Sequence, residues 1–238
     1  LKLGYKRNFF ELYKSKKKTE NLLFTVQIFA LFIFIFFFIV NKIFEENILL
    51  HFKELKDIDN FWSLLILALM FDSLSKYYLI FLENNLNSQK YFIITFTKTA
   101  LYFILIIYFL FNNYGIVSLL YSLLASNSLI LIFTILSQIK NSSFKFKKNY
   151  IKSILKISVP NTPKVLFGQL NSKIDKILIG ILSTFSNTGI YAIAQSISYV
   201  IFQIMTSLDK VFITKTNKML FDNENDKIGP YLTSFIYF

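Results

Sequence analysis

The sequence predicts an all-α, polytopic membrane helix bundle, and three observations carry that prediction. Of 238 residues, 54% are hydrophobic and 29 are Phe, with a mean hydropathy of +0.50, which exceeds what a soluble domain of this size usually buries. Apolar segments of about twenty residues recur, and a helix of that length crosses ~30 Å of hydrocarbon. Lys and Arg collect in alternate loops, as in proteins that cross a membrane several times.

The apolar segments divide into two groups around a basic linker. Residues 1–139 are predicted to be the end of an N-terminal helix bundle, and residues 158–238 the start of a C-terminal one. The linker, 140–157, holds six Lys and no acidic residue. Because the chain opens on Leu1 and stops inside an apolar run, we expect it to be a fragment. The spans are predicted at about 22–40, 61–82, 91–111, 116–136, 160–182 and 189–212, with a truncated one at 228–238.

The distribution of basic residues predicts the topology. The loops on one side hold seventeen Lys and Arg, and those on the other side hold three. The basic side is therefore expected to be cytoplasmic, in the cytoplasmic (inner) membrane. The net charge of +12 is explained first by this topology and second by an anionic ligand, and we expect no nucleic-acid partner. The basic side comprises loops 1–20, 84–90, 139–156 and 213–229; the other comprises 41–60, 112–115 and 183–188.

Three charged residues lie inside the second and third spans. Asp72 and Lys76 are four residues apart and share a helix face, while Lys98 has no carboxylate within one turn of its own helix. A charge within a span costs a few kcal/mol unless it is paired or hydrated. Asp72 and Lys76 are either a neutral pair that positions the helix or cavity charges. Lys98 either snorkels to the headgroups or faces an aqueous cavity.

The fourth and fifth spans differ in character. Small residues give the fourth span a face suited to close helix packing: Ser118, Ser122, Ala125 and Ser126. In the fifth, Pro160 suits a helix start and Pro163 is expected to loosen the first turn. Its predicted polar face contains Lys164, Gly168, Asn171 and Asp175, with Lys173 and Lys176 beside the carboxylate. The sixth span has a polar side with Tyr191, Gln195, Ser198, Thr206 and Asp209.

An ordered set of residues across these last two spans resembles a known family. The set is Val159, Pro160, Pro163, Asp175, Gly180, Gly189, Tyr191 and Ala194. It resembles the seventh and eighth helices of the polysaccharide flippases, the lipid-linked oligosaccharide exporters of the MATE-like superfamily that serve polysaccharide and O-antigen biosynthesis. The chain departs from that family at Glu83, where a basic residue is common, and near Leu208, where a proline is common.

The resemblance implies a partial MATE-like fold and a transporter rather than an enzyme. Its substrate would be a polyprenyl-pyrophosphate glycan, its other partners membrane lipids and either H⁺ or Na⁺, and its mechanism alternating access between two bundles. We expect no catalytic residue, cofactor or metal. Local salt bridges would be the alternative role for each lysine. The predicted cavity residues are Lys76, Lys98, Lys164, Asn171, Lys173, Lys176 and Gln195, and the predicted ion-coupling residues are Asp72, Asp175 and Asp209.

Two other function classes stay open. A cation-coupled exporter of small cationic molecules should have a cavity dominated by acids, whereas these spans hold more lysines than carboxylates. A membrane-embedded glycan polymerase or ligase should have a sizeable extramembrane loop, whereas the longest external loop is about twenty residues. No glycine-rich phosphate loop is present in the sequence, so direct ATP drive lacks support.

Overall fold

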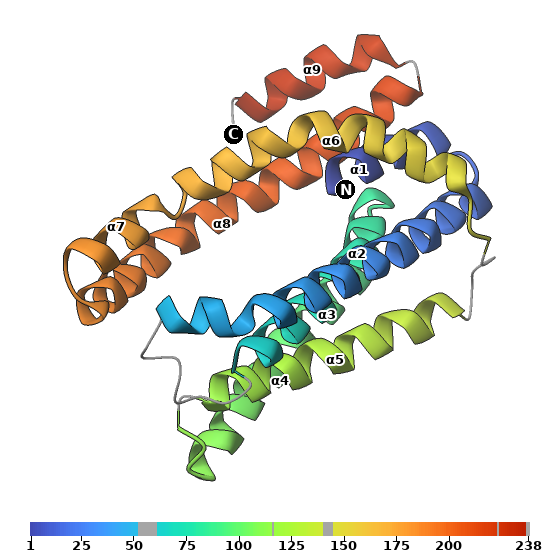
Figure 1. Cartoon of the computed structure of the whole chain (residues 1–238). Helices are drawn as coiled ribbons and strands as arrows, with labels where there is room; N and C mark the ends of the chain where they lie inside the picture. Colours follow the sequence, from blue (N-terminus) through green and yellow to red (C-terminus); the bar gives the residue numbers. More distant parts are fainter. Residues whose placement is uncertain (52–60, 116, 140–144, 223, 237–238) are drawn as a thin grey trace. The chain divides into compact units, whose positions relative to one another are not determined.

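The computed structural model describes residues 1–51, 61–115, 117–139, 145–222 and 224–236, and within them the chain is helical with no strand (Figure 1). The all-α prediction is therefore confirmed. The helices, in chain order, are α1 (Lys2–Leu12), α2 (Lys16–His51), α3 (Phe61–Asn84), α4 (Ser88–Phe111), α5 (Val117–Ile139), α6 (Lys148–Asn171), α7 (Ile174–Leu182), α8 (Phe185–Phe221) and α9 (Asn225–Ile236).

The chain divides into two compact units, Leu1–Lys152 and Ser153–Phe238, which we call unit 1 and unit 2. The division falls within the predicted linker, and α6, which begins at Lys148, runs through the boundary. Residues 140–144 of that linker lie outside the described part. The linker residues Ile151, Ile154 and Leu155 recur at helical spacing, which favours continuation of the helix.

Unit 1 holds four helices that are long and apolar enough to cross a membrane, among the residues described. Segments of these four helices coincide with the first four predicted spans. The helix that contains the first predicted span extends further than expected. This helix, α2, continues to His51, so the loop predicted from residue 41 is helical over its first half. The rest of that acidic loop, including Glu54, Asp57 and Asp59, lies outside the described residues.

The predicted small-residue face of α5 forms much of the core of unit 1. Ser118, Ser122 and Ser126 are fully buried, and α5 packs on both α3 and α4. The hydroxyl groups of Ser122 and Ser126 donate to carbonyls of α5, and that of Ser118 donates to the carbonyl of Gly115 just before the helix, so little polar surface is left unpaired at this contact. Asn127 adds an interhelical link, because its Nδ2 donates to the carbonyl of Ala68 at 2.9 Å. Small side chains thus allow the close backbone approach that the sequence predicted.

The first twenty residues were expected to be a loop, and the structure corrects this. They contain α1, which packs against α2 and the end of α3. Tyr5 and Phe9 are fully buried; they make edge contacts with Tyr77 and Phe81 of α3 at ring-centroid distances of 6.1 and 5.8 Å. Residues spaced by four positions share one face of a helix, so the aromatic residues of this basic segment form the packing surface.

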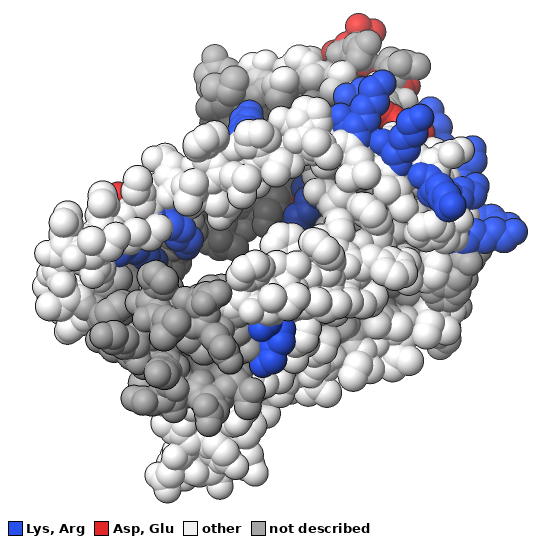
Figure 2. Space-filling view, in the orientation of Figure 1, with Lys and Arg blue, Asp and Glu red and all other residues white. Residues whose placement is uncertain are grey.

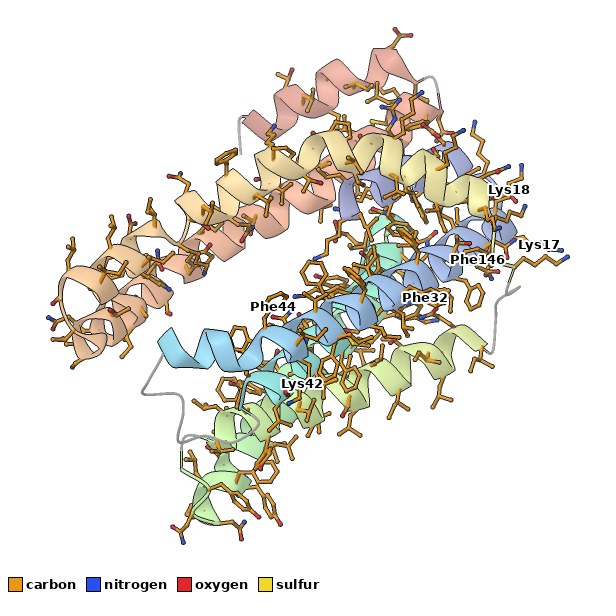
Figure 3. The ribbon with its side chains drawn as sticks, in the orientation of Figure 1. Lys17, Lys18, Phe32, Lys42, Phe44 and Phe146 are labelled. Carbon is orange, nitrogen blue, oxygen red and sulfur yellow. The ribbon has the colours of Figure 1, made fainter. Side chains whose placement is uncertain are left out.

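The segment after α5 is held against the start of α2. The backbone N–H of Lys145 donates to Asn21 Oδ1 and that of Lys147 to Thr25 Oγ1, each at 3.2 Å. Two basic stretches distant in sequence therefore meet at one end of unit 1. Figure 3 labels Lys17, Lys18 and Phe146 there, and Figure 2 shows Lys and Arg gathered around the start of α2. We call this the basic end.

Away from the basic end, α2 and α4 keep many large apolar side chains exposed. Phe32 and Phe36 of α2 keep 64% and 66% of their surface exposed, and Phe92 and Phe96 of α4 are similarly open. Figure 3 labels Phe32 along α2. Exposed aromatic rings at helical spacing on a helix of this length are typical of a surface that faces lipid or further helices.

Unit 2 differs from the predicted pattern at its first span. The expected helix at 160–182 is divided: α6 begins at Lys148 and ends at Asn171, and α7 follows at Ile174. Pro160 lies inside α6 and is therefore not a helix start. The break follows from the backbone at Lys173, whose N–H bonds to the carbonyl of Leu170 three residues back rather than four.

The two later elements of unit 2 are α8 and α9. The sixth predicted span, 189–212, lies within α8, which is longer and starts after a cap in which Thr184 Oγ1 accepts from Asn187 N at 3.2 Å. α9 covers most of the truncated span predicted at 228–238. The last two residues of that predicted span lie outside the described part.

Candidate functional site

The three intramembrane charges of unit 1 form one cluster. Asp72 lies on α3, with Lys76 one turn later, and Lys98 projects from α4. Lys76 donates to one carboxylate oxygen of Asp72 and Lys98 donates to the other. The interhelical pair with Lys98 is the contact that the sequence did not supply, since the two residues are 26 positions apart.

The cluster has one positive charge more than negative charge. The side chain of Asp72 is 14% exposed, that of Lys98 23% and that of Lys76 45%. Because two ammonium groups already bond to this one carboxylate, the net positive charge of the cluster disfavours a cation such as Na⁺ there. Lys76 is the most open of the three, so it is the group best able to contact an anion without breaking the cluster.

Lys2 of α1 adds a further positive charge near this cluster. The pKa of its ammonium group is lowered, first because surrounding protein atoms reduce its hydration and then because of the charge of Lys76, while Asp72 acts in the opposite sense. Its surface stays exposed. Sequence reasoning missed Lys2, because it treated the first residues as topology signals only.

A second ion pair joins α1 to the end of α3. Lys6 Nζ lies 2.8 Å from Glu83 Oε1, and the Glu83 side chain is 15% exposed. Glu83, which stands where the resemblance would place a basic residue, thus pairs with a positive charge that Lys6 supplies from a neighbouring helix. In the sequence, a single carboxylate at the end of an apolar span indicates that a positively charged partner lies nearby, but it does not identify that partner.

The remaining predicted residues lie in unit 2. Lys164 and Asn171 are exposed on α6, while Lys173, Asp175 and Lys176 lie at or near the start of α7. Because the helix breaks after Asn171, Asp175 does not continue the polar face of α6, which corrects the predicted four-residue face.

The two predicted residues of α8 lie on a helix that also contacts α7. Gln195 is half-buried and Asp209 exposed. One contact links the two helices through predicted residues: the hydroxyl of Tyr191 donates to Asp175 Oδ2 at 3.2 Å. This pairs two residues of the set that carried the family resemblance, so the short α7 is oriented against α8 by its own carboxylate.

A comparison with known families shows the family of the chain. A family model described as polysaccharide biosynthesis protein matches residues 10–227. The chain belongs to this family. No curated protein and no protein of known structure gives a significant match.

The family assignment supports the resemblance to polysaccharide flippases. With four candidate spans in unit 1, this polysaccharide biosynthesis protein is a multi-pass membrane protein. Within the described residues, no group of three or more acidic or imidazole side chains is close enough to hold a metal ion. The expected absence of a cofactor stays a prediction.

Proposed function

We propose that this polysaccharide biosynthesis protein contributes to a flippase that moves a lipid-linked anionic oligosaccharide across the cytoplasmic membrane. The observation that carries the proposal is the pairing of one carboxylate with two ammonium groups at the α3–α4 contact. A polyprenyl-pyrophosphate glycan is anionic, and a site with excess positive charge away from bulk water attracts a group of that sign. Lys76 is the proposed contact.

The proposed mechanism is alternating access between two helix bundles, to which unit 1 and unit 2 would each contribute. H⁺ or Na⁺ would drive the movement, with Asp175 and Asp209 as the coupling groups. Both are exposed, and Asp175 accepts a neutral hydrogen bond from Tyr191. Asp72 is less suited to this role because two lysines already pair with its single negative charge.

The two other function classes have less support. A cavity for cationic compounds should present free carboxylates, whereas Asp72 is outnumbered by lysines. A polymerase or ligase should have an extramembrane site, whereas the α3–α4 connection is the tight turn 85–87 and α4 ends in another at 112–115. We therefore propose a transporter with no catalytic residue and basic loops in the cytoplasm.

The proposal is tested in cells that lack the complete protein. Membrane vesicles of known orientation are prepared, and lipid-linked glycan in each leaflet is measured with a membrane-impermeant glycan-modifying reagent. We expect the glycan to accumulate in the cytoplasmic leaflet and the wild-type protein to release it. Normal delivery to the outer leaflet, with a defect only in chain length or transfer, would overturn the flippase proposal in favour of a polymerase or ligase.

One variant and one control link this assay to the cluster. Lys76→Met removes the open ammonium group, so we expect roughly tenfold slower delivery from the loss of one charge-assisted contact. Lys76→Arg keeps the charge and is expected to retain most of the delivery. Equal rates for Met and wild type, at equal protein level, would remove Lys76 from the substrate path.

A further inference from the structure

A pocket lies at the basic end of unit 1, apart from the Asp72 cluster. Its volume is about 270 Å³, and residues from α2, α3, α4, α5 and the α3–α4 turn line it. Drug-sized ligands usually occupy pockets of at least ~300 Å³, so this one suits a smaller group. The lining includes Lys16, Glu20, Lys90 and Gln138 among its polar residues and Leu23, Phe81 and Leu82 among its apolar ones.

Gln138 gives the first indication of a ligand. Its side chain is 93% buried at the end of α5, with a relative exposure of 7%, and it lines the pocket. Within the part of the chain that the structure describes, its Nε2 has no hydrogen-bond partner. A buried donor without an acceptor costs about 1–3 kcal/mol, so an acceptor in the pocket would be stabilised.

Glu20 gives an indication of the opposite sign. Its side chain is only 10% exposed, and the ion pair described for it is with Lys16 Nζ at 4.0 Å, which is too long for a hydrogen bond. The Lys16 side chain is 81% exposed and so is largely hydrated. A carboxylate this buried favours a closer cationic partner than Lys16 provides.

The lining therefore has charges of both signs around one small space. Lys90, in the first turn of α4, supplies a cation to the same lining as Gln138, and the N-terminal end of that helix adds a partial positive charge. Glu20 supplies the anion. A purely anionic ligand would meet the Glu20 carboxylate, and a purely cationic one would leave the Gln138 donor unpaired.

We propose that this pocket binds the headgroup of an ethanolamine phospholipid. The ammonium group would lie against Glu20, and the phosphate would accept from Gln138 and pair with Lys90. The apolar part of the lining would contact the glycerol and the first methylene groups. Because the pocket opens among the loop-side ends of spanning helices, it lies at the depth of lipid headgroups.

The proposal goes beyond glycan transport, since a bound phospholipid is a resident component rather than cargo. It would join the ends of α2, α4 and α5 at the place where the basic segment after α5 is already tied to α2. A phosphoethanolamine group has ammonium hydrogens to donate to a carboxylate, which a choline group lacks. Selectivity for ethanolamine over choline and glycerol headgroups is therefore the specific expectation.

The test measures thermal unfolding of the complete protein in detergent with added lipids of identical acyl chains. The lipids are phosphatidylethanolamine, phosphatidylglycerol and phosphatidylcholine, and free phosphoethanolamine and inorganic phosphate are added separately. We expect the ethanolamine lipid to bind roughly tenfold more tightly than the other two, from one additional charge-assisted contact. Equal shifts for all three lipids, or the largest shift with the glycerol lipid, would overturn the proposal. A full effect from inorganic phosphate alone would also overturn it, because the site would then be a phosphate site.

Variants assign the headgroup contacts. Glu20→Gln should abolish the preference for ethanolamine while leaving a residual response to all three lipids. Lys90→Ala should weaken all three. Lys42→Ala, near the other end of α2 where Figure 3 labels Lys42, is the matched control and should leave the preference intact. An unchanged preference in Glu20→Gln, read as the ratio between lipids within one variant, would contradict the proposal even if that variant is less stable.

Discussion

The carboxylates of unit 1 and unit 2 that were predicted as site residues differ in burial and in pairing. In unit 1 the Asp72 carboxylate is mostly buried and bonded to ammonium groups from two helices. In unit 2 the Asp175 carboxylate is exposed and its described partner is the hydroxyl of Tyr191. Breaking a buried pair leaves a charge without compensation, whereas an exposed group keeps its water. Charges in unit 1 should therefore matter for stability and substrate binding, and those in unit 2 for transport without a change in stability.

The largest effect is expected for Asp72→Asn. This change leaves Lys76 and Lys98 without their shared carboxylate and close to each other, which should cost about 3 kcal/mol or more. Thermal unfolding of the purified complete protein measures the loss. The double variant Asp72→Asn/Lys98→Met removes one of the two ammonium groups and should recover part of the stability. If the single variant unfolds at the wild-type temperature, the cluster does not support the fold.

The next effect concerns transport driven by an ion gradient. Asp175→Asn removes a proposed coupling carboxylate, so transport should lose its dependence on the H⁺ or Na⁺ gradient and fall roughly tenfold. Protein level and unfolding temperature should stay near wild type because the side chain is exposed. Tyr191→Phe is the matched control, because it removes the 3.2 Å hydrogen bond and keeps the carboxylate. Gradient-dependent transport by Asp175→Asn would exclude this residue from coupling.

A smaller effect is expected for Lys164→Ala. Lys164 is exposed on α6 and is proposed to contact the anionic glycan. Its removal should lower export a few-fold without changing protein level, since a solvent-exposed charge contributes up to about 1 kcal/mol. Delivery of lipid-linked glycan to the outer leaflet provides the measurement. Unaltered export would remove Lys164 from the substrate path and leave the cationic surface to unit 1.

The difference between the units also explains what the sequence could predict. Apolar runs predicted the four spans of unit 1, and the serine spacing predicted the packing face of α5, because both are local patterns. The pairing of Lys98 with Asp72 depends on how two helices pack, which the spacing along either helix does not determine. The same holds for Lys6 with Glu83 and for the pocket beside Gln138.

Unit 2 shows where local rules mislead. Pro160 suits a helix start, yet the basic segment before it has apolar residues at helical spacing and starts α6 twelve residues earlier. The break after Asn171 was missed because the sequence there, Asn171 to Lys173, contains neither Gly nor Pro. The predicted polar face failed for this reason, although each of its residues is exposed.

The smallest effect at neutral pH is expected for Tyr5→Phe in α1. Tyr5 is fully buried, and within the described residues its hydroxyl has no hydrogen-bond partner, so its loss should change stability by less than about 1 kcal/mol. Burial raises the pKa of Tyr5 well above its usual value of 10.0, with a further contribution from Tyr77. Below pH 10 the neutral form is present in both the folded and unfolded chains. Above pH 10 the unfolded chain ionises first, so wild-type stability falls as the pH rises towards the folded-state pKa.

Tyr5→Phe lacks this loss, and the two proteins should therefore diverge in unfolding temperature only above pH 10. Parallel curves across that range would show that the hydroxyl is hydrated in the folded protein.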